Sequence, residues 1–412
     1  MPTTRLARVM FFSFISAATL LGTLSWLPFR YRDEVAGIRN EVLPPASITS
    51  VSLLPPLSSQ TTVLATQAIA KYCAAQPLRV SDHFHRWRFD GLQGAYSNNL
   101  ELEREVGQVQ NQSHFKKIFA GSPPLLFRSP YGWEVRQRTP KAARDHWEYE
   151  HHVDQFLATC AEIGVPVTFQ IETDFGRVSI GELLDASRRS FDPSQELCWT
   201  LVAYCTYLPE EPQWTNRFGD LCSYDAIVEK ILSLSLDDGS CGGTHKQFAL
   251  AYCLAKVHLS SDLRRQCEQY LERSSRALER SQLSSGAWTP FWATPDSGTM
   301  GGPDSASIRG VDLVRITGHQ LEWVCLAPPN VRPSAECLSR ALYFLADALN
   351  RADVASIQKE YCAYSHAACM LQRAMSRELP SGSRQPSAAK VAEKTARCVT
   401  AAEGLRPTAQ TP

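Results

Sequence analysis

The stretch that decides the fold is HKQFALAYCLAKVHLSSDLRRQCEQYLERSSRALERSQ, residues 245–282. Its first part, His245–His258, is apolar nearly all round, whereas Asp262–Gln282 places apolar residues every three or four positions with charges between them. A helix that is apolar on every side must be covered on every side, but an amphipathic helix can face water on one side. The stretch therefore predicts a buried helix followed by a surface helix.

This pair of helices recurs along the chain. The predicted buried members are Trp147–Ile163, Ser194–Leu208, His245–His258, Leu313–Leu326 and Ile357–Leu371. The predicted amphipathic members are Ile180–Ser190, Tyr224–Leu236, Asp262–Gln282, Pro333–Leu349 and Pro386–Ala402, and Thr62–Ala75 with Asn98–Val109 makes a weaker sixth pair. The buried members begin roughly 45 to 70 residues apart, a length that fits a helix–turn–helix repeat.

About six such hairpins predict an all-α fold in which an inner ring of helices is wrapped by an outer ring, an α/α toroid. An open solenoid with the same alternation is the alternative, because the twist between repeats cannot be taken from one sequence. Segments 123–139 and 165–178 interrupt the helical pattern and predict short hairpins or mixed loops. Segment 283–310 is rich in Gly, Ser and Pro, and we expect it to form a flap over one face.

The composition excludes some classes of function. The 412 residues carry 42 Lys and Arg against 42 Asp and Glu, so the formal net charge is zero and no field attracts nucleic acid. A hydrophobic fraction of 44% supplies enough apolar material for a globular body. We therefore expect a folded protein without a nucleic-acid partner.

The first residues predict a membrane anchor. Residues 9–28 carry no charge, and a helix of this length spans a bilayer core of about 30 Å. A cleaved signal segment is the alternative, and both place the bulk of the chain outside the cytoplasm. We expect a single-pass membrane protein with an anchor at 1–29, a Pro- and Ser-rich spacer at 30–61, a toroid domain at 62–403 and a disordered tail at 404–412.

The 13 cysteines do not have the spacing of a disulfide framework. Most of them lie in apolar runs, so we interpret them as small packing residues. Disulfide pairing stays open.

Gln282, Gly286 and Trp288 resemble the QW motif of terpenoid cyclases and the related prenyltransferase β-subunits, in which Gln caps a helix end and Trp packs over the turn. The Asp-x-Asp-Asp acid motif of squalene cyclases is absent from the sequence, so cyclase chemistry is not carried over. A broader resemblance, through CGGTH at 241–245 and TGH-x-LEW at 317–323, is to uncharacterised membrane-anchored bacterial proteins of planctomycete type. It covers residues 62–402 and implies the toroid but no reaction.

Polar residues stand at or near the start of several predicted buried helices. Because such helix ends converge on one mouth of a toroid, these side chains would line a central pocket. They are His151, His152, Glu196, His245, His319, Glu322 and His366. For each of them, capping or core packing is the structural alternative.

His245 and His319 follow the glycine-containing segments CGGT and TG, and Glu322 is one helical turn beyond His319. A histidine beside a carboxylate is the pair that proton transfer needs. We predict His245, His319 and Glu322 as catalytic residues. The predicted substrate-binding residues are His152, Glu196, Trp199, Tyr224, Trp288 and His366.

No cofactor is required by the sequence, but a metal site is an option. Cys241 and His245 are four residues apart, and His319 could be a third ligand, similar to the zinc set of prenyltransferases. The resulting hypothesis is a membrane-tethered enzyme that performs acid–base chemistry on a carbohydrate or isoprenoid-like ligand. A non-catalytic helical-repeat binding or scaffold protein is the alternative.

Overall fold

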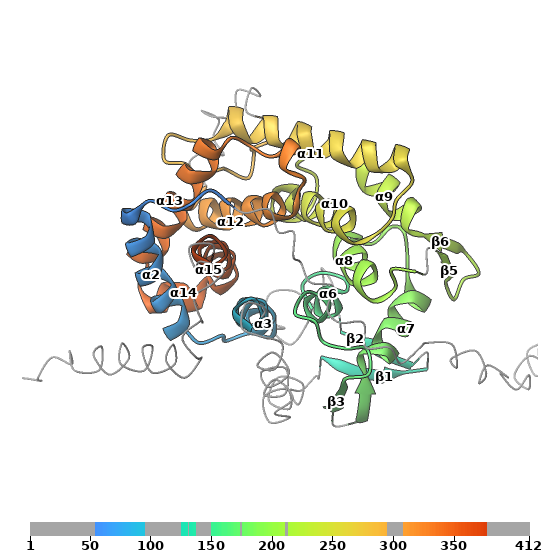
Figure 1. Ribbon diagram of the computed structural model, residues 1–412. Coiled ribbons are helices and arrows are strands. Elements are labelled where there is room, and N and C mark those ends of the chain that lie inside the picture. The colour runs from blue at the N-terminus through green and yellow to red at the C-terminus, as the bar shows by residue number, and fades with distance from the viewer. Residues whose placement is uncertain are drawn as a thin grey trace, which may run out of the picture. The chain divides into compact units, whose positions relative to one another are not determined.

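The computed structural model describes residues 54–94, 125–130, 132–136, 150–173, 175–210, 213–294 and 308–376. These residues are mostly helical, with a few short strands, so the prediction of an all-α protein is confirmed (Figure 1). Within these ranges, none of the helices has the length and apolar character needed to cross a bilayer. The predicted anchor at 9–28, the predicted helices Asn98–Val109 and Pro386–Ala402, and the tail at 404–412 lie outside them.

Six helices, which we call the inner helices, pack on one another in chain order. They are α3 (Val80–Gly94), α6 (Gln155–Glu162), α8 (Cys198–Tyr207), α10 (Thr244–Lys256), α12 (Gly310–Leu326) and α15 (Tyr361–Met375). The last of them, α15, also packs against the first, α3 (Figure 1). Every residue of α8 from Cys198 to Cys205 is buried, and so is every residue of α10 from Thr244 to Leu254. The predicted burial on all sides of these helices is confirmed.

Five further helices cover the inner ones. They are α2 (Ser59–Ala74), α7 (Ile180–Ser190), α9 (Tyr224–Leu232), α11 (Ser261–Ser281) and α13 (Ala335–Arg351). The short α14 (Val354–Lys359) leads into α15. In α11 the buried residues Leu263, Cys267, Tyr270 and Leu271 recur every three or four positions, and the Ser260 hydroxyl accepts a hydrogen bond from the Leu263 amide at its start. The predicted amphipathic helix at 262–282 is confirmed.

The sixth pair differs from the prediction. The helix expected at Thr62–Ala75 is α2, which packs on α13 and α15, whereas the unpredicted α3 lies between α15 and α6. The sequence of α3 contains HFHRWRFD, residues 83–90. Because of its charged and imidazole groups, it lacks the apolar pattern by which the other buried helices were predicted. The core also begins before the predicted domain start, because Leu54 and Leu57 from the predicted spacer are buried.

Three two-stranded hairpins lie between the helices. β1 (Leu126–Ser129) pairs with β2 (Gly132–Val135), and β3 (Gln170–Thr173) pairs with β4 (Gly176–Ser179), where hairpins were predicted. β5 (Gln213–Thr215) and β6 (Leu221–Ser223) form a third that was not predicted. The short helices η3 (Ser240–Gly243) and η6 (Pro329–Val331) complete the described elements. Of segment 283–310, residues 283–294 and 308–310 are described, so the predicted flap lies mostly outside them.

The QW-like turn joins two outer helices. The Gln282 side-chain amide donates to the carbonyls of Gly286 and Cys337, and the second of these carbonyls belongs to α13. The Trp288 indole donates to the Leu278 carbonyl in α11. Both side chains therefore have a structural use.

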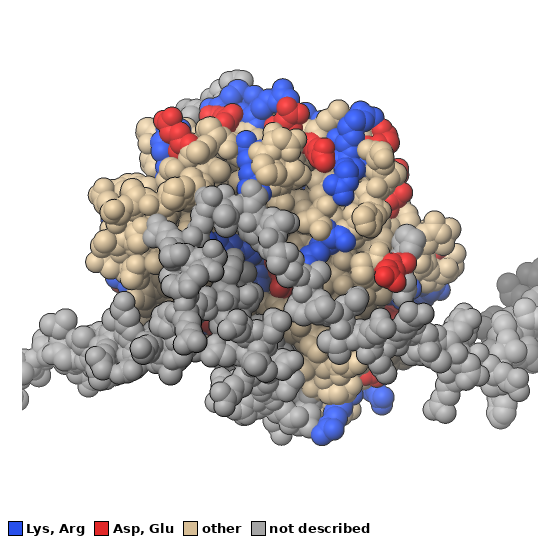
Figure 2. All heavy atoms as spheres, in the orientation of Figure 1, with Lys and Arg blue, Asp and Glu red and all other residues tan. Residues whose placement is uncertain are grey.

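Charges of both signs are interspersed on the surface drawn in Figure 2, most clearly along the upper edge where α11 lies. Arg264 lies beside Glu268 and Arg276 beside Glu272, each one turn apart on that helix. No disulfide joins the cysteines of the described ranges.

Candidate functional site

The site is built at the start of α10 by an unusual turn. Cys241, Gly242 and Gly243 all adopt left-handed backbone conformations, with φ of 52°, 63° and 77°. A Cβ atom on Gly243 would lie 2.3 Å from the Leu236 carbonyl oxygen, so only glycine fits there. Cys241 has a side chain in a conformation that glycine prefers, and such strained residues cluster at functional sites.

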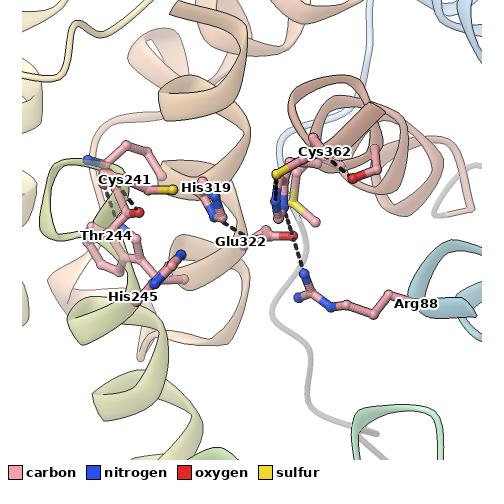
Figure 3. Close-up of polar contacts among 12 residues, drawn as sticks. Arg88, Cys241, Thr244, His245, His319, Glu322 and Cys362 are labelled. Carbon is pink, nitrogen blue, oxygen red and sulfur yellow. Dashed lines mark hydrogen bonds and ion pairs between the residues drawn. The ribbon is translucent and has the colours of Figure 1, made fainter. Parts of the chain in front are cut away.

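Two hydrogen bonds hold this turn. The Trp292 indole donates to the Gly242 carbonyl at 2.8 Å, and the Thr244 hydroxyl donates to the Cys241 carbonyl at 3.1 Å. Gly243 occupies the N-terminal capping position of α10, and Thr244 is its first helical residue. The turn thereby places the Cys241 thiol beside the histidines of α10 and α12 (Figure 3).

The first half of the site is a carboxylate between two imidazoles. Glu196 Oε2 lies 2.7 Å from His152 Nδ1, and Glu196 Oε1 lies 3.0 Å from His245 Nδ1. The two rings meet edge to face, with centroids 4.7 Å apart. Trp199, the second residue of α8, packs against His245 with the ring centroids 5.0 Å apart. These contacts bring together the segments preceding α6 and α8 with the first turn of α10.

The second half repeats this arrangement on α12 and α15. Glu322 Oε2 lies 3.1 Å from His319 Nδ1, and Glu322 Oε1 lies 2.8 Å from His366 Nδ1. The Arg88 guanidinium of α3 adds a third partner, with its Nη1 atom 3.3 Å from Glu322 Oε1 (Figure 3). Arg88 also donates to Glu162 at 3.0 Å, so α3 is tied to α6 and α12 together.

The two halves form one continuous array. The rings of His245 and His319 lie 5.0 Å apart, and those of His319 and His366 lie 3.7 Å apart. The ring of His85, from α3, meets His366 edge to face at 4.8 Å. We call the residues His85, His152, Glu196, His245, His319, Glu322 and His366 the histidine–glutamate array.

Gly318 makes the approach of α12 to α15 possible. A Cβ atom at this position would lie 2.7 Å from His366 Cβ and 3.1 Å from the Ala367 amide nitrogen. Because residue 318 has no side chain, the neighbouring His319 reaches the ring of His366.

Burial keeps the imidazoles neutral. Desolvation lowers the pKa of His245 to about 4, although the hydrogen bond to Glu196 opposes this shift. Desolvation and the nearby His366 lower the pKa of His319 to about 3. Desolvation is also the main reason that the pKa values of His366 and His85 are lowered, so all four rings are neutral near pH 7.

The two carboxylates stay ionised. Burial alone would raise the pKa of Glu196, but hydrogen bonds from His152 and His245 lower it far below its usual range. Burial would likewise raise the pKa of Glu322, but Arg88 and the bonds from the imidazoles lower it well below the ordinary value. In this site the imidazoles meet the carboxylates through Nδ1, so a neutral ring that donates there has its proton on Nδ1. The Nε2 atom of such a ring then carries a free lone pair.

Four groups of three side chains in the described residues have ligand atoms within 4.8 Å of one another. They are Cys241, His245 and His319; His85, Cys362 and His366; His152, Glu196 and His245; and His319, Glu322 and His366. The last two rest on imidazole–carboxylate contacts of 2.7–3.1 Å. Two ligands of a tetrahedral zinc ion lie about 3.3 to 3.8 Å apart. Those contacts are therefore hydrogen bonds, and the two cysteine-containing groups are the candidate ligand sets.

Most of the sequence-predicted site residues come together. Seven of them belong to the array or touch it: His152, Glu196, Trp199, His245, His319, Glu322 and His366. Tyr224 and Trp288 are held elsewhere, because the Tyr224 hydroxyl donates to the carbonyls of Tyr204 and Leu208 and the Trp288 indole donates to α11. His151 is exposed.

Four residues of the site were missed: His85, Arg88, Glu162 and Cys362. The signal for Cys362 was present, since Cys362 and His366 are four residues apart, as are Cys241 and His245. The signal for His85 and Arg88 lies in the HFHRWRFD run, which has too few apolar residues to be recognised as a buried helix.

Comparison of the chain with protein-family models, curated proteins and solved structures found no match. The site is therefore interpreted from its own geometry.

Proposed function

We propose that this protein is a membrane-tethered α/α-toroid enzyme with a catalytic metal ion bound by Cys241, His245 and His319. The observation that carries the proposal is the convergence of one thiol and two imidazoles, each of which places its Nδ1 atom against a carboxylate.

The toroid is supported by the packing of the inner helices, in which α15 returns to α3, and by the amphipathic helices outside them. The tether is supported by the uncharged segment 9–28. In such a ring, the inner helices offer residues from several repeats to a single site, and the array takes residues from α3, α10, α12 and α15 and from the segments before α6 and α8.

The metal site is supported by the chemistry of its donors. A thiolate and two neutral imidazoles suit zinc, and histidine ligands of zinc commonly donate their second ring nitrogen to a carboxylate. Glu196 takes that position behind His245, and Glu322 takes it behind His319. His319 Nε2 is buried and has no hydrogen-bond partner, which is costly for a polar atom unless it binds something.

Three protein ligands leave a fourth position open, as in catalytic zinc sites, where a bound water becomes acidic near neutral pH. That water would perform the acid–base chemistry on a carbohydrate or isoprenoid-like substrate. The side chains of Glu196 and His152 are 26% and 17% exposed, so they form the accessible edge of the array where substrate would contact it, beside Trp199.

A second candidate is metal-free acid–base catalysis by the imidazoles themselves. It is favoured by the Nδ1 bonds to Glu196 and Glu322, because a carboxylate in this position also orients a histidine that acts as a general base. The two candidates differ in one measurable respect, since only the first loses activity to a chelator.

The test combines metal analysis with a screen of glycans and polyprenyl compounds. We expect the purified full chain in mild detergent to contain zinc. Cys241→Ser, His245→Ala and His319→Ala should lose the zinc ion of this set, together with turnover, while retaining their helical circular dichroism. His258→Ala, a change to an exposed histidine on the segment after α10, should retain both.

A protein without stoichiometric zinc, even after incubation with zinc salts, would refute the metal site. Turnover that survives chelation but is lost in His245→Ala would establish the second candidate. Full turnover in both His245→Ala and His319→Ala would refute an enzyme centred on the array.

A further inference from the structure

A second cysteine–histidine set lies on the other side of Glu322. Cys362 Sγ is 3.7 Å from His366 Nε2, and the His85 ring meets the His366 ring edge to face at 4.8 Å. The ligand atoms of these three residues lie within 4.8 Å of one another. Closing them to the spacing of about 3.3 to 3.8 Å around a zinc ion needs movements of about 1 Å, which side-chain rotation can supply.

The two sets have the same construction. Each contains one half-buried cysteine four residues before a histidine, and a second histidine from a neighbouring inner helix. Cys241 lies in η3, directly before α10, whereas Cys362 lies within α15. In each set a histidine Nδ1 donates to Glu322, from His319 in one and from His366 in the other. The sets meet at the rings of His319 and His366, whose centroids lie 3.7 Å apart with the ring planes tilted by 39°.

We propose that His85, Cys362 and His366 bind a second zinc ion, so that this protein has a two-metal centre with Glu322 as the carboxylate behind both ions. This inference rests on the proposed function, because it completes the metal site on Cys241, His245 and His319. Glu322 would orient one ligand of each ion with its two oxygen atoms, which couples the two sites.

The charge of the centre supports two cations. The carboxylates of Glu162 and Glu322 share one guanidinium, that of Arg88, and the carboxylate of Glu196 contacts only imidazoles among the groups of the array. The carboxylates of this cluster therefore outnumber its guanidinium, which is unfavourable where charge is poorly solvated. Two divalent ions bound by two thiolates would restore balance, and each binding event would release the thiol proton to solvent.

The cysteines are suited to this role. In each set the cysteine sulfur lies within 4.8 Å of a ligand nitrogen of both histidines, and thiolate with imidazole is a donor set that zinc prefers. Both cysteine residues are half-buried.

Two zinc ions with open positions near one another would hold two oxygen atoms of one substrate, or a substrate oxygen and the attacking water. The second site therefore assigns His85, Cys362 and His366 to the reaction centre and not to packing alone.

The experiment measures zinc per chain in the full protein by plasma mass spectrometry. We expect two zinc ions in the wild type and one in each of Cys362→Ser, His85→Ala and Cys241→Ser. Cys73→Ser, which removes a half-buried thiol in α2 outside both sets, should retain two. One zinc in the wild type that is lost in Cys241→Ser but kept in Cys362→Ser would overturn the second site and leave the proposed function intact.

A titration of the metal-free wild type with Co²⁺ does not depend on how the variants fold. Thiolate-to-cobalt absorption that rises to two equivalents supports the two-metal centre. A break at one equivalent overturns it, and no thiolate absorption at all overturns both metal sites.

Discussion

Glu322 is the group whose replacement tests the array most directly. Its side chain is 2% exposed and accepts from two imidazoles while pairing with Arg88. Glu322→Gln retains the shape but removes the charge and replaces one acceptor oxygen by a donor. The new NH₂ group faces the N–H of His319 or of His366, so one of the two hydrogen bonds from these imidazoles is lost. The other becomes a hydrogen bond between neutral groups.

The cost follows from these contacts. A hydrogen bond to a charged group contributes about 1.5 to 3 kcal/mol, and removal of one partner from a buried ion pair costs about 3 to 5 kcal/mol. Arg88 retains Glu162 as a partner, so we expect the lower part of that range, about 3 to 4 kcal/mol at pH 7. At about 2 °C per kcal/mol for a body of this size, the melting temperature should fall by about 6 to 8 °C.

The assay is thermal unfolding of the chelator-treated full chain in detergent, followed by circular dichroism. Glu360→Gln is the matched control, because Glu360 pairs with Arg309 and Arg315 at a partly exposed position where ion pairs contribute at most about 1 kcal/mol. In the zinc-bound protein, Glu322→Gln should also weaken metal affinity by about 10- to 100-fold. A melting temperature within 1 °C of wild type would refute the central role of Glu322.

Two further predictions concern packing and pH. Gly318→Ala should lower the stability by about 1 to 2 kcal/mol, because the new Cβ atom would lie 2.7 Å from His366 Cβ and this overlap outweighs the gain in helix propensity. Gly310→Ala is the control, because a Cβ atom there has no neighbour within 4 Å. Equal melting temperatures of the two variants would contradict the close approach of α12 to α15. Glu150 is buried, and desolvation followed by the charge of Asp154 raises its pKa well above 4.5. As pH rises, the unfolded chain loses this proton before the folded protein does. The stability that the protonated Glu150 contributes is therefore fully present below about pH 4.5 and is lost as pH rises, so the stability of Glu150→Gln relative to wild type should increase by about 1 to 2 kcal/mol between pH 4.5 and pH 7.5. A constant difference in stability across that interval would contradict the raised pKa.

Sequence periodicity was sufficient for most helices because it reports burial directly. Ile180–Ser190 was predicted with the bounds that α7 has, and the apolar runs around α8 and α10 were recognised because a fully covered helix needs apolar residues on every side. The same rule failed for α3. Its buried face carries His85 and Arg88, whose burial depends on partners from α6, α12 and α15 that are distant in sequence.

Position relative to helix starts was a weaker guide. His245 lies in the first turn of α10 as predicted, but His319 lies well inside α12, which begins at Gly310. The conformation that brings His319 into the site comes instead from the close contact at Gly318. Tyr224 and Trp288 were predicted to bind substrate because they are aromatic residues near helix ends. Their polar atoms instead donate to backbone carbonyls, those of Tyr204 and Leu208 for Tyr224 and that of Leu278 for Trp288.

The sequence by itself determined that this protein is mostly helical, where most of its buried and surface helices run, and that Glu322 is one turn from His319, because these properties depend on residues a few positions apart. Only the tertiary structure decided that Glu196 joins His152 to His245, that Glu322 joins His319 to His366, and that His85 and Cys362 stand beside them. Most of these contacts link segments that are tens to hundreds of residues apart. Their geometry is set by how the helices pack, which no local pattern encodes.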